Sequence, residues 1–204
     1  RNGYLTFGSF NRLGKISPVV LDMWARAMHA CDGSRLLMGA VGSTEAKEKM
    51  VAEFAARGIS SERLRFEPKK PANEYLALHN DIDIILDTFP YNGGTTSGLA
   101  LWMGVPVLTM AGRTRMSNAG AGGMRRFGLE RFVATDPEDF VQKAQQLSIS
   151  LEELAGVRQG LRKRLIEAPD RSDAFITKGF ERALRMMWQR WCSGLPAETF
   201  FVDS

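Results

Sequence analysis

Short, almost purely apolar runs alternate with longer helical patterns from the start of the chain to about residue 150. Six runs have the length and composition of strands, at 4–10, 35–41, 63–67, 82–87, 105–110 and 131–134. Strands that are apolar on both faces are typical of parallel sheets covered by helices on each side. The alternation therefore predicts an α/β fold with a Rossmann-like, doubly wound parallel sheet.

Helices are expected between these strands and after the last of them. Ser17 followed by Pro18 is a helix start, because the serine can cap the first turn and proline suits its first position. The helices after it are expected at about 44–58, 71–80, 96–103, 117–127, 137–148, 150–168 and 173–192. We therefore expect a single domain over residues 1–204, in which 137–204 forms a helical C-terminal extension.

The last helix carries a broad apolar stripe, formed by Ile176, Phe180, Leu184, Met187, Trp188 and Trp191. An isolated helix that faces solvent would carry fewer apolar residues. The chain starts at Arg1 and enters a strand almost at once, so we expect it to be cut from a longer protein. Two interpretations of the stripe stay open: it covers its own domain, or it also docks onto the N-terminal half.

The amino-acid composition limits the cellular compartment and the kinds of partner that are expected for this chain. The two cysteines, Cys31 and Cys192, give neither a disulfide framework nor a thiolate metal cluster, which favours a reducing cytoplasm. No apolar stretch approaches the roughly 20 residues that span a bilayer, so no membrane partner is expected. The net charge of the chain is +4. The densest cluster of basic residues is expected to form a solvated helix face rather than a nucleic-acid site, and it consists of Arg158, Arg162, Lys163 and Arg164.

The loop after the first strand is glycine-containing and doubly basic. In open α/β sheets, ligands bind beyond the carboxyl ends of the strands, so this loop is a candidate site. It is not a P-loop, because five residues rather than four separate Gly8 from Gly14 and Ile16 follows Lys15. Arg12 and Lys15 can still neutralise a diphosphate without metal, through charge-assisted hydrogen bonds.

The loop after the fourth strand, Asp87–Gly98, ends at a helix N-terminus. Gly93 and Gly94 allow the backbone to approach a ligand closely. The hydroxyls of Thr95 and Thr96 lie beside the free N–H groups of the first turn, and together these groups can bind an anion. An ordinary capped turn is the alternative interpretation of the same pattern.

Two motifs resemble the family of O-linked N-acetylglucosamine transferases, including its bacterial-type members: LDTFPYNGGTTSGLALWMGVPVLTM and FGSFNRLGKIS. The resemblance extends over nearly the whole chain. It implies the C-terminal catalytic lobe of a GT-B glycosyltransferase, the half that binds the nucleotide sugar. The implied activity is transfer of N-acetylglucosamine from UDP-N-acetylglucosamine to Ser or Thr of proteins. No metal and no other cofactor is implied.

The resemblance also implies roles for individual residues. Lys15 would be the catalytic residue that holds the diphosphate, Thr95 and Thr96 would bind phosphate oxygens, and the loop from Lys70 to Tyr75 would border uracil and ribose. The residues implied at the UDP-sugar are Asn11, Arg12, Lys15, Lys70, Tyr75, Asn92, Gly93, Gly94, Thr95 and Thr96.

The acceptor protein or peptide would be bound by the missing N-terminal part, which in this family includes tetratricopeptide-type helical repeats. We therefore expect the fragment alone to be inactive. Leu99 stands where the family usually has an acidic residue, and Asn118 where it commonly has Arg. These departures keep a second interpretation open, a degenerate, non-catalytic lobe that serves as a nucleotide-binding or scaffold module.

Overall fold

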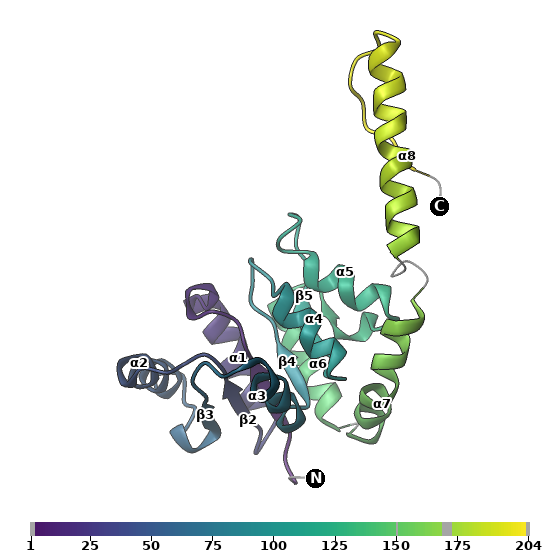
Figure 1. Cartoon of the computed structure of the whole chain (residues 1–204). Coiled ribbons are helices and arrows are strands. Elements are labelled where there is room, and N and C mark those ends of the chain that lie inside the picture. The colour runs from purple at the N-terminus through teal and green to yellow at the C-terminus, as the bar shows by residue number, and fades with distance from the viewer. Residues whose placement is uncertain (1–2, 150, 169–172, 203–204) are drawn as a thin grey trace. The chain divides into compact units, whose positions relative to one another are not determined.

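The computed structural model describes residues 3–149, 151–168 and 173–202, and the chain divides into two compact units, Arg1–Arg162 and Lys163–Ser204. The first unit contains a parallel sheet of six strands in the order β3-β2-β1-β4-β5-β6 (Figure 1). The six predicted strands are confirmed, each shorter than its apolar run: β1 (Thr6–Ser9), β2 (Arg35–Met38), β3 (Leu64–Phe66), β4 (Ile84–Leu86), β5 (Val107–Met110) and β6 (Val133–Ala134).

The helices lie close to their predicted positions. α1 (Pro18–Ala30) begins after Ser17, whose Oγ accepts a hydrogen bond from the Val20 N–H at 3.4 Å. After α2 (Thr44–Ala55) the chain turns at Gly58, whose φ of 77° suits glycine. The other helices are α3 (Ala72–Ala77), α4 (Thr95–Trp102), α5 (Ala119–Arg126), α6 (Pro137–Ile149), α7 (Leu151–Glu167) and α8 (Asp173–Cys192). The expected start of α7 at position 150 lies outside the described residues.

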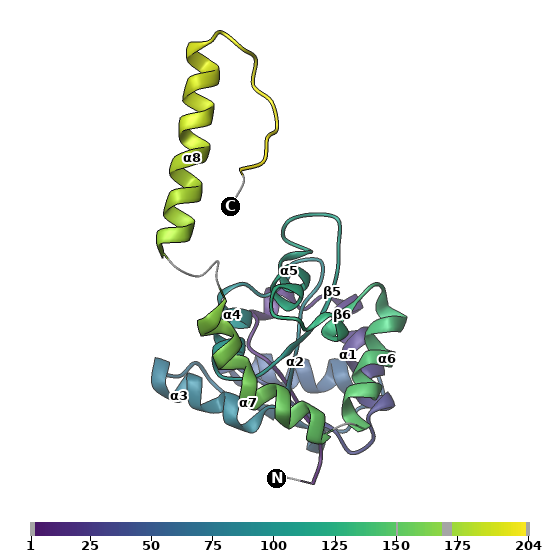
Figure 2. The same cartoon turned by 90° about the vertical axis from the view of Figure 1, so that its right-hand side faces the viewer.

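Short 3-10 helices connect several of these elements: η1 (Leu13–Lys15), η2 (Ser61–Arg63), η3 (Leu78–Asp81) and η4 (Glu130–Phe132). α1 packs along α6 on one side of the sheet, and α3, α4 and α7 lie on the other (Figure 2). Large side chains on the strands and helices are fully buried between these layers, among them Phe7, Trp24, Phe54, Phe132 and Phe140. Each such burial contributes about 1.5–3 kcal/mol to folding.

Two arginines of α7 bind backbone carbonyls on neighbouring elements. Arg158 donates to the carbonyls of Ile82 and His79, and Arg162 Nε donates to the carbonyl of Trp102 at 2.8 Å. The prediction of a solvated basic face is therefore wrong for Arg158, which is half-buried. Tertiary hydrogen bonds to carbonyls, which sequence spacing does not reveal, account for the difference.

In the second unit, α8 confirms the predicted helix at 173–192. The six residues of its apolar stripe are exposed, from 48% for Leu184 to 75% for Trp191. The structure therefore leaves both interpretations of the stripe open. None of the helices in the described ranges combines the length and the apolar character that crossing a membrane requires.

Candidate functional site

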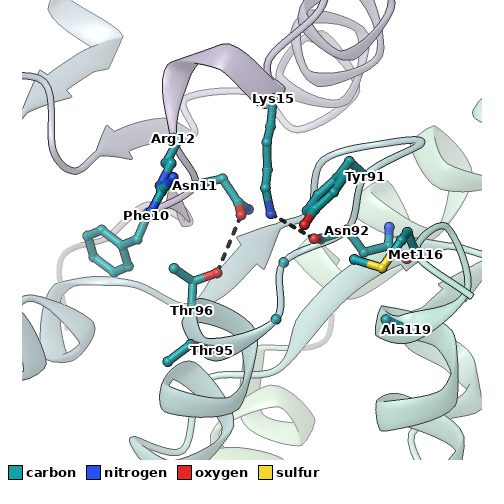
Figure 3. Close-up of a pocket in the computed structure, with 12 residues that line it drawn as sticks. Phe10, Asn11, Arg12, Lys15, Tyr91, Asn92, Thr95, Thr96, Met116 and Ala119 are labelled. Carbon is teal, nitrogen blue, oxygen red and sulfur yellow. Dashed lines mark hydrogen bonds between the residues drawn. The ribbon is translucent and has the colours of Figure 1, made fainter.

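The sheet order creates a switch point between β1 and β4. From β1 the chain moves to β2 and β3 on one side, and from β4 it moves to β5 and β6 on the other. Doubly wound sheets bind ligands in the crevice at this point, beyond the carboxyl ends of the strands. A cavity of about 390 Å³ lies there (Figure 3), lined by Phe10, Asn11, Arg12, Lys15, Tyr91, Asn92, Gly93, Gly94, Thr95, Thr96, Met116 and Ala119.

Lys15 ends η1 and reaches into this cavity. Its Nζ donates to the carbonyl of Asn92 at 2.9 Å and lies 4.0 Å from the centre of the Tyr91 ring. Burial lowers the pKa of Lys15; the charge of Asp87 opposes this change and that of Arg12 adds to it. The ammonium is thus fixed at the cavity by contacts to the loop after β4.

Gly93 and Gly94 lead into α4 at the opposite side of the cavity. No side chain of the described residues caps this helix at Gly94, so the first-turn N–H groups are open to a ligand. The Thr96 hydroxyl donates to Asn11 Oδ1 at 3.4 Å, which links the first turn of α4 to the loop after β1 (Figure 3). A helix N-terminus without a cap, facing a lysine, has the geometry and charge to bind an anion.

Asn92 connects the loops that follow β4 and β5. Its Nδ2 donates to the carbonyl of Thr88 at 2.8 Å, and its Oδ1 accepts from the N–H of Gly120 at 3.3 Å. Its own N–H donates to the carbonyl of Met116 at 3.1 Å. Asn92 therefore shapes the cavity wall, in addition to presenting its carbonyl to Lys15.

Asp87 lies directly behind the cavity, where β4 ends. The residue is 1% exposed, and its carboxylate accepts hydrogen bonds from the Gly93 N–H at 2.7 Å and from the Thr109 hydroxyl at 2.8 Å. Burial raises the pKa of Asp87 to about 6, while these hydrogen bonds and the charge of Lys15 act in the opposite direction. Sequence reasoning missed this residue, although a carboxylate directly after an apolar strand is a signal that could have found it.

Ten residues were predicted to bind the UDP-sugar. The structure brings eight of them to the cavity: Asn11, Arg12, Lys15, Asn92, Gly93, Gly94, Thr95 and Thr96. Lys70 instead pairs with Glu67 at 3.3 Å and Glu74 at 3.9 Å. Tyr75 packs against Phe10, with ring centroids 5.0 Å apart. Neither residue is among those that line the cavity, and their roles toward uracil and ribose stay predictions.

Four lining residues were not predicted: Phe10, Tyr91, Met116 and Ala119. Phe10 and Tyr91 lie within the two motifs. Met116 comes from the loop after β5 and Ala119 is the first residue of α5, where no sequence pattern marked them. The two departures from the family pattern are Leu99, which lies on α4, and Asn118, which immediately precedes α5. The Asn118 side chain makes no capping hydrogen bond with the described residues.

The sheet order and the switch-point cavity define a doubly wound domain of the Rossmann type, the class that includes the nucleotide-binding halves of GT-B glycosyltransferases. Comparison with known families identifies the chain further. It belongs to glycosyl transferase family 41, whose family model matches residues 2–184. The predicted family and fold class are thereby confirmed.

Individual relatives agree with this membership. The chain is 37% identical over 196 residues to a barley (Hordeum vulgare) protein and 35% identical over 196 residues to one from Petunia hybrida, covering 95% of this chain and 21% of each relative. Both are named "Probable UDP-N-acetylglucosamine--peptide N-acetylglucosaminyltransferase SPINDLY". The structure of a mutant Thermobaculum terrenum O-GlcNAc transferase matches with a TM-score of 0.86 and 38% identity, over 95% of this chain and 38% of that one. The chain thus spans about a fifth of the length of these curated relatives.

Proposed function

We propose that this chain is the donor-binding half of a protein O-glycosyltransferase that takes N-acetylglucosamine from UDP-N-acetylglucosamine. The observation that carries the proposal is the switch-point cavity, where the Lys15 ammonium and the uncapped N-terminus of α4 face the same space. Membership of glycosyl transferase family 41 supports a sugar as the transferred group, and the names of the relatives support N-acetylglucosamine and a peptide acceptor.

In this mechanism a Ser or Thr hydroxyl of the acceptor attacks the anomeric carbon and gives up its proton to a base outside this chain, and the bond from that carbon to the diphosphate breaks. Negative charge then grows on the departing UDP. Lys15 exchanges the Asn92 carbonyl for a phosphate oxygen, and the N–H groups of α4 bind the same diphosphate. Fixed cationic and dipolar groups of this kind stabilise the charge of a leaving group without a metal ion.

The acceptor, in this proposal, is recognised by parts of the protein outside this chain, including helical repeats, and the reaction takes place in the cytoplasm. A degenerate lobe that binds nucleotide without catalysis is the second candidate, because the Leu99 side chain offers no hydrogen bond to ribose hydroxyls. Donor binding is common to both candidates, and turnover distinguishes them.

We predict that the chain binds UDP in the presence of a chelator as tightly as in the presence of magnesium or manganese. The physical reason is that Lys15 and the first turn of α4 supply the positive field that a metal ion would otherwise provide. Isothermal titration calorimetry measures both affinities, and uridine without phosphates serves as the control for contacts to the nucleoside. Binding that appears only after addition of a divalent metal contradicts the prediction.

A further inference from the structure

The carboxylate of Asp87 joins three segments that meet behind the cavity. One oxygen accepts from the N–H of Thr88, at the start of the loop, at 2.9 Å and from the N–H of Gly93, at its end, at 2.7 Å. The other oxygen accepts from Thr109 on β5 at 2.8 Å. Gly93 lines the cavity and immediately precedes Gly94, the residue before the first turn of α4. The Asp87 side chain therefore sets the position of the N-terminus of this helix.

Glycines enclose the carboxylate closely. A Cβ at Gly120 would lie 2.6 Å from Asp87 Oδ2, and a Cβ at Gly93 would lie 3.2 Å from Asp87 Oδ1. The main chain of Asp87 is fixed as well, because its carbonyl accepts from Trp24 Nε1 at 3.1 Å. The carboxylate therefore cannot turn away from the cavity when a ligand enters.

We propose that Asp87 is a positioning residue of the diphosphate site, whose buried carboxylate holds the Gly93 peptide and places a negative charge behind the bound diphosphate, so that the donor binds together with a proton. The inference rests on the proposed function, because it needs a diphosphate in the switch-point cavity. It assigns to Asp87 no contact with the sugar or with the reacting atoms.

The charges around Asp87 set the sign of the effect. Among the described residues, Lys15 on η1 is the charged group that acts on it, whereas Trp24 on α1, Thr109 on β5 and Gly120 on α5 are uncharged. Burial already raises the pKa of the free carboxyl to about 6. A diphosphate adds like charge and raises that pKa further. Between the free and the bound pKa, binding takes up a proton, and affinity rises as pH falls through this window.

Calorimetry with UDP-N-acetylglucosamine as the probe tests the inference. Both phosphates of this probe are esterified, whereas the terminal phosphate of UDP itself titrates near pH 6 and would obscure the result. Titrations near pH 6.5 in two buffers of different ionisation enthalpy give the number of protons taken up. For the wild-type chain we expect uptake of a fraction of a proton, and an affinity about tenfold higher at low than at high pH if the ligand raises the carboxyl pKa by one pH unit.

Asp87→Asn keeps the shape of the side chain, and the amide oxygen can still accept a hydrogen bond from the Gly93 N–H, but this side chain cannot titrate. We expect this variant to lose the proton uptake and the pH dependence that the wild type shows. The matched control is Asp83→Asn, which removes a carboxylate hydrogen-bonded to the Thr6 N–H at the opposite end of β4 and should behave as wild type. Thr109→Val removes one donor to the carboxylate and should move the pH window upward, which keeps the test decisive if Asp87→Asn does not fold.

Equal proton uptake in wild type and Asp87→Asn overturns the inference, as does an unchanged pH window in Thr109→Val. Loss of proton uptake in Asp83→Asn also overturns it, because the effect would then not be specific to Asp87. Absence of UDP-N-acetylglucosamine binding by the wild-type chain at every pH is a different result, which overturns the proposed function itself.

Discussion

Replacement of Lys15 by alanine is expected to lower the turnover of the proposed full-length transferase by about 10²–10³, the scale observed when a preorganised oxyanion donor is removed. Donor binding should weaken by a smaller factor. The reason is that charge on the diphosphate grows as UDP leaves, so the ammonium stabilises the transition state more than the bound donor. The structure fixes this ammonium at the cavity, where Nζ is held by the Asn92 carbonyl at 2.9 Å.

Steady-state kinetics of Lys15→Ala, together with its melting temperature, test this expectation. Lys15→Met keeps the aliphatic stem without the charge and should lose turnover to a similar extent. Lys49→Ala removes an exposed ammonium from α2 and serves as the control, with turnover unchanged and stability within about 0.5 kcal/mol of wild type. Wild-type turnover in a folded Lys15→Ala protein would refute the assignment.

Most of the fold could be predicted because burial on both faces makes parallel strands visible as apolar runs. The length of each strand could not be predicted, because apolar character reflects burial and not participation in the hydrogen bonds of the sheet. Ile82 is fully buried and belongs to the apolar run at 82–87, yet β4 extends only from Ile84 to Leu86. The helix at Pro18 was predicted to the residue, because its start depends on the local capping by Ser17.

Within the site, the residues that could be predicted are those whose signal is local. The loops after β1 and β4 carry glycines, threonines and basic residues at strand ends, and the structure brings them to one cavity. Met116 and Ala119 line the same cavity, but they reach it through tertiary contacts that no local pattern shows, such as the hydrogen bond between the Met116 carbonyl and the Asn92 N–H. For Lys70 a local signal did exist, because Glu67 and Glu74 stand only three and four positions away and pair with it in the structure.

Replacement of Gly120 by alanine is expected to lower the free energy of unfolding by about 2–3 kcal/mol, although alanine is the better helix former. A methyl group there would lie 2.3 Å from Thr109 Oγ1 and 2.6 Å from Asp87 Oδ2. These two atoms are buried and hydrogen-bonded to each other, so the methyl either strains the packing or separates them. Overpacking costs about 1–3 kcal/mol, and an unpaired buried polar group costs a similar amount.

Gly122→Ala provides the matched control, because the two glycines lie on the same helix and receive the same methyl group. A Cβ at Gly122 meets no atom within 4 Å other than the adjacent backbone of its own helix, so only the helix preference of alanine remains. This variant should be more stable than wild type by up to about 1 kcal/mol. Chemical denaturation of both variants measures the difference. Stability changes of opposite sign in the two variants support the close contact between α5 and the Asp87 carboxylate. Equal stability of the two variants contradicts this contact, because a methyl group that fits freely at Gly120 would mean that the wall behind the cavity is loosely packed.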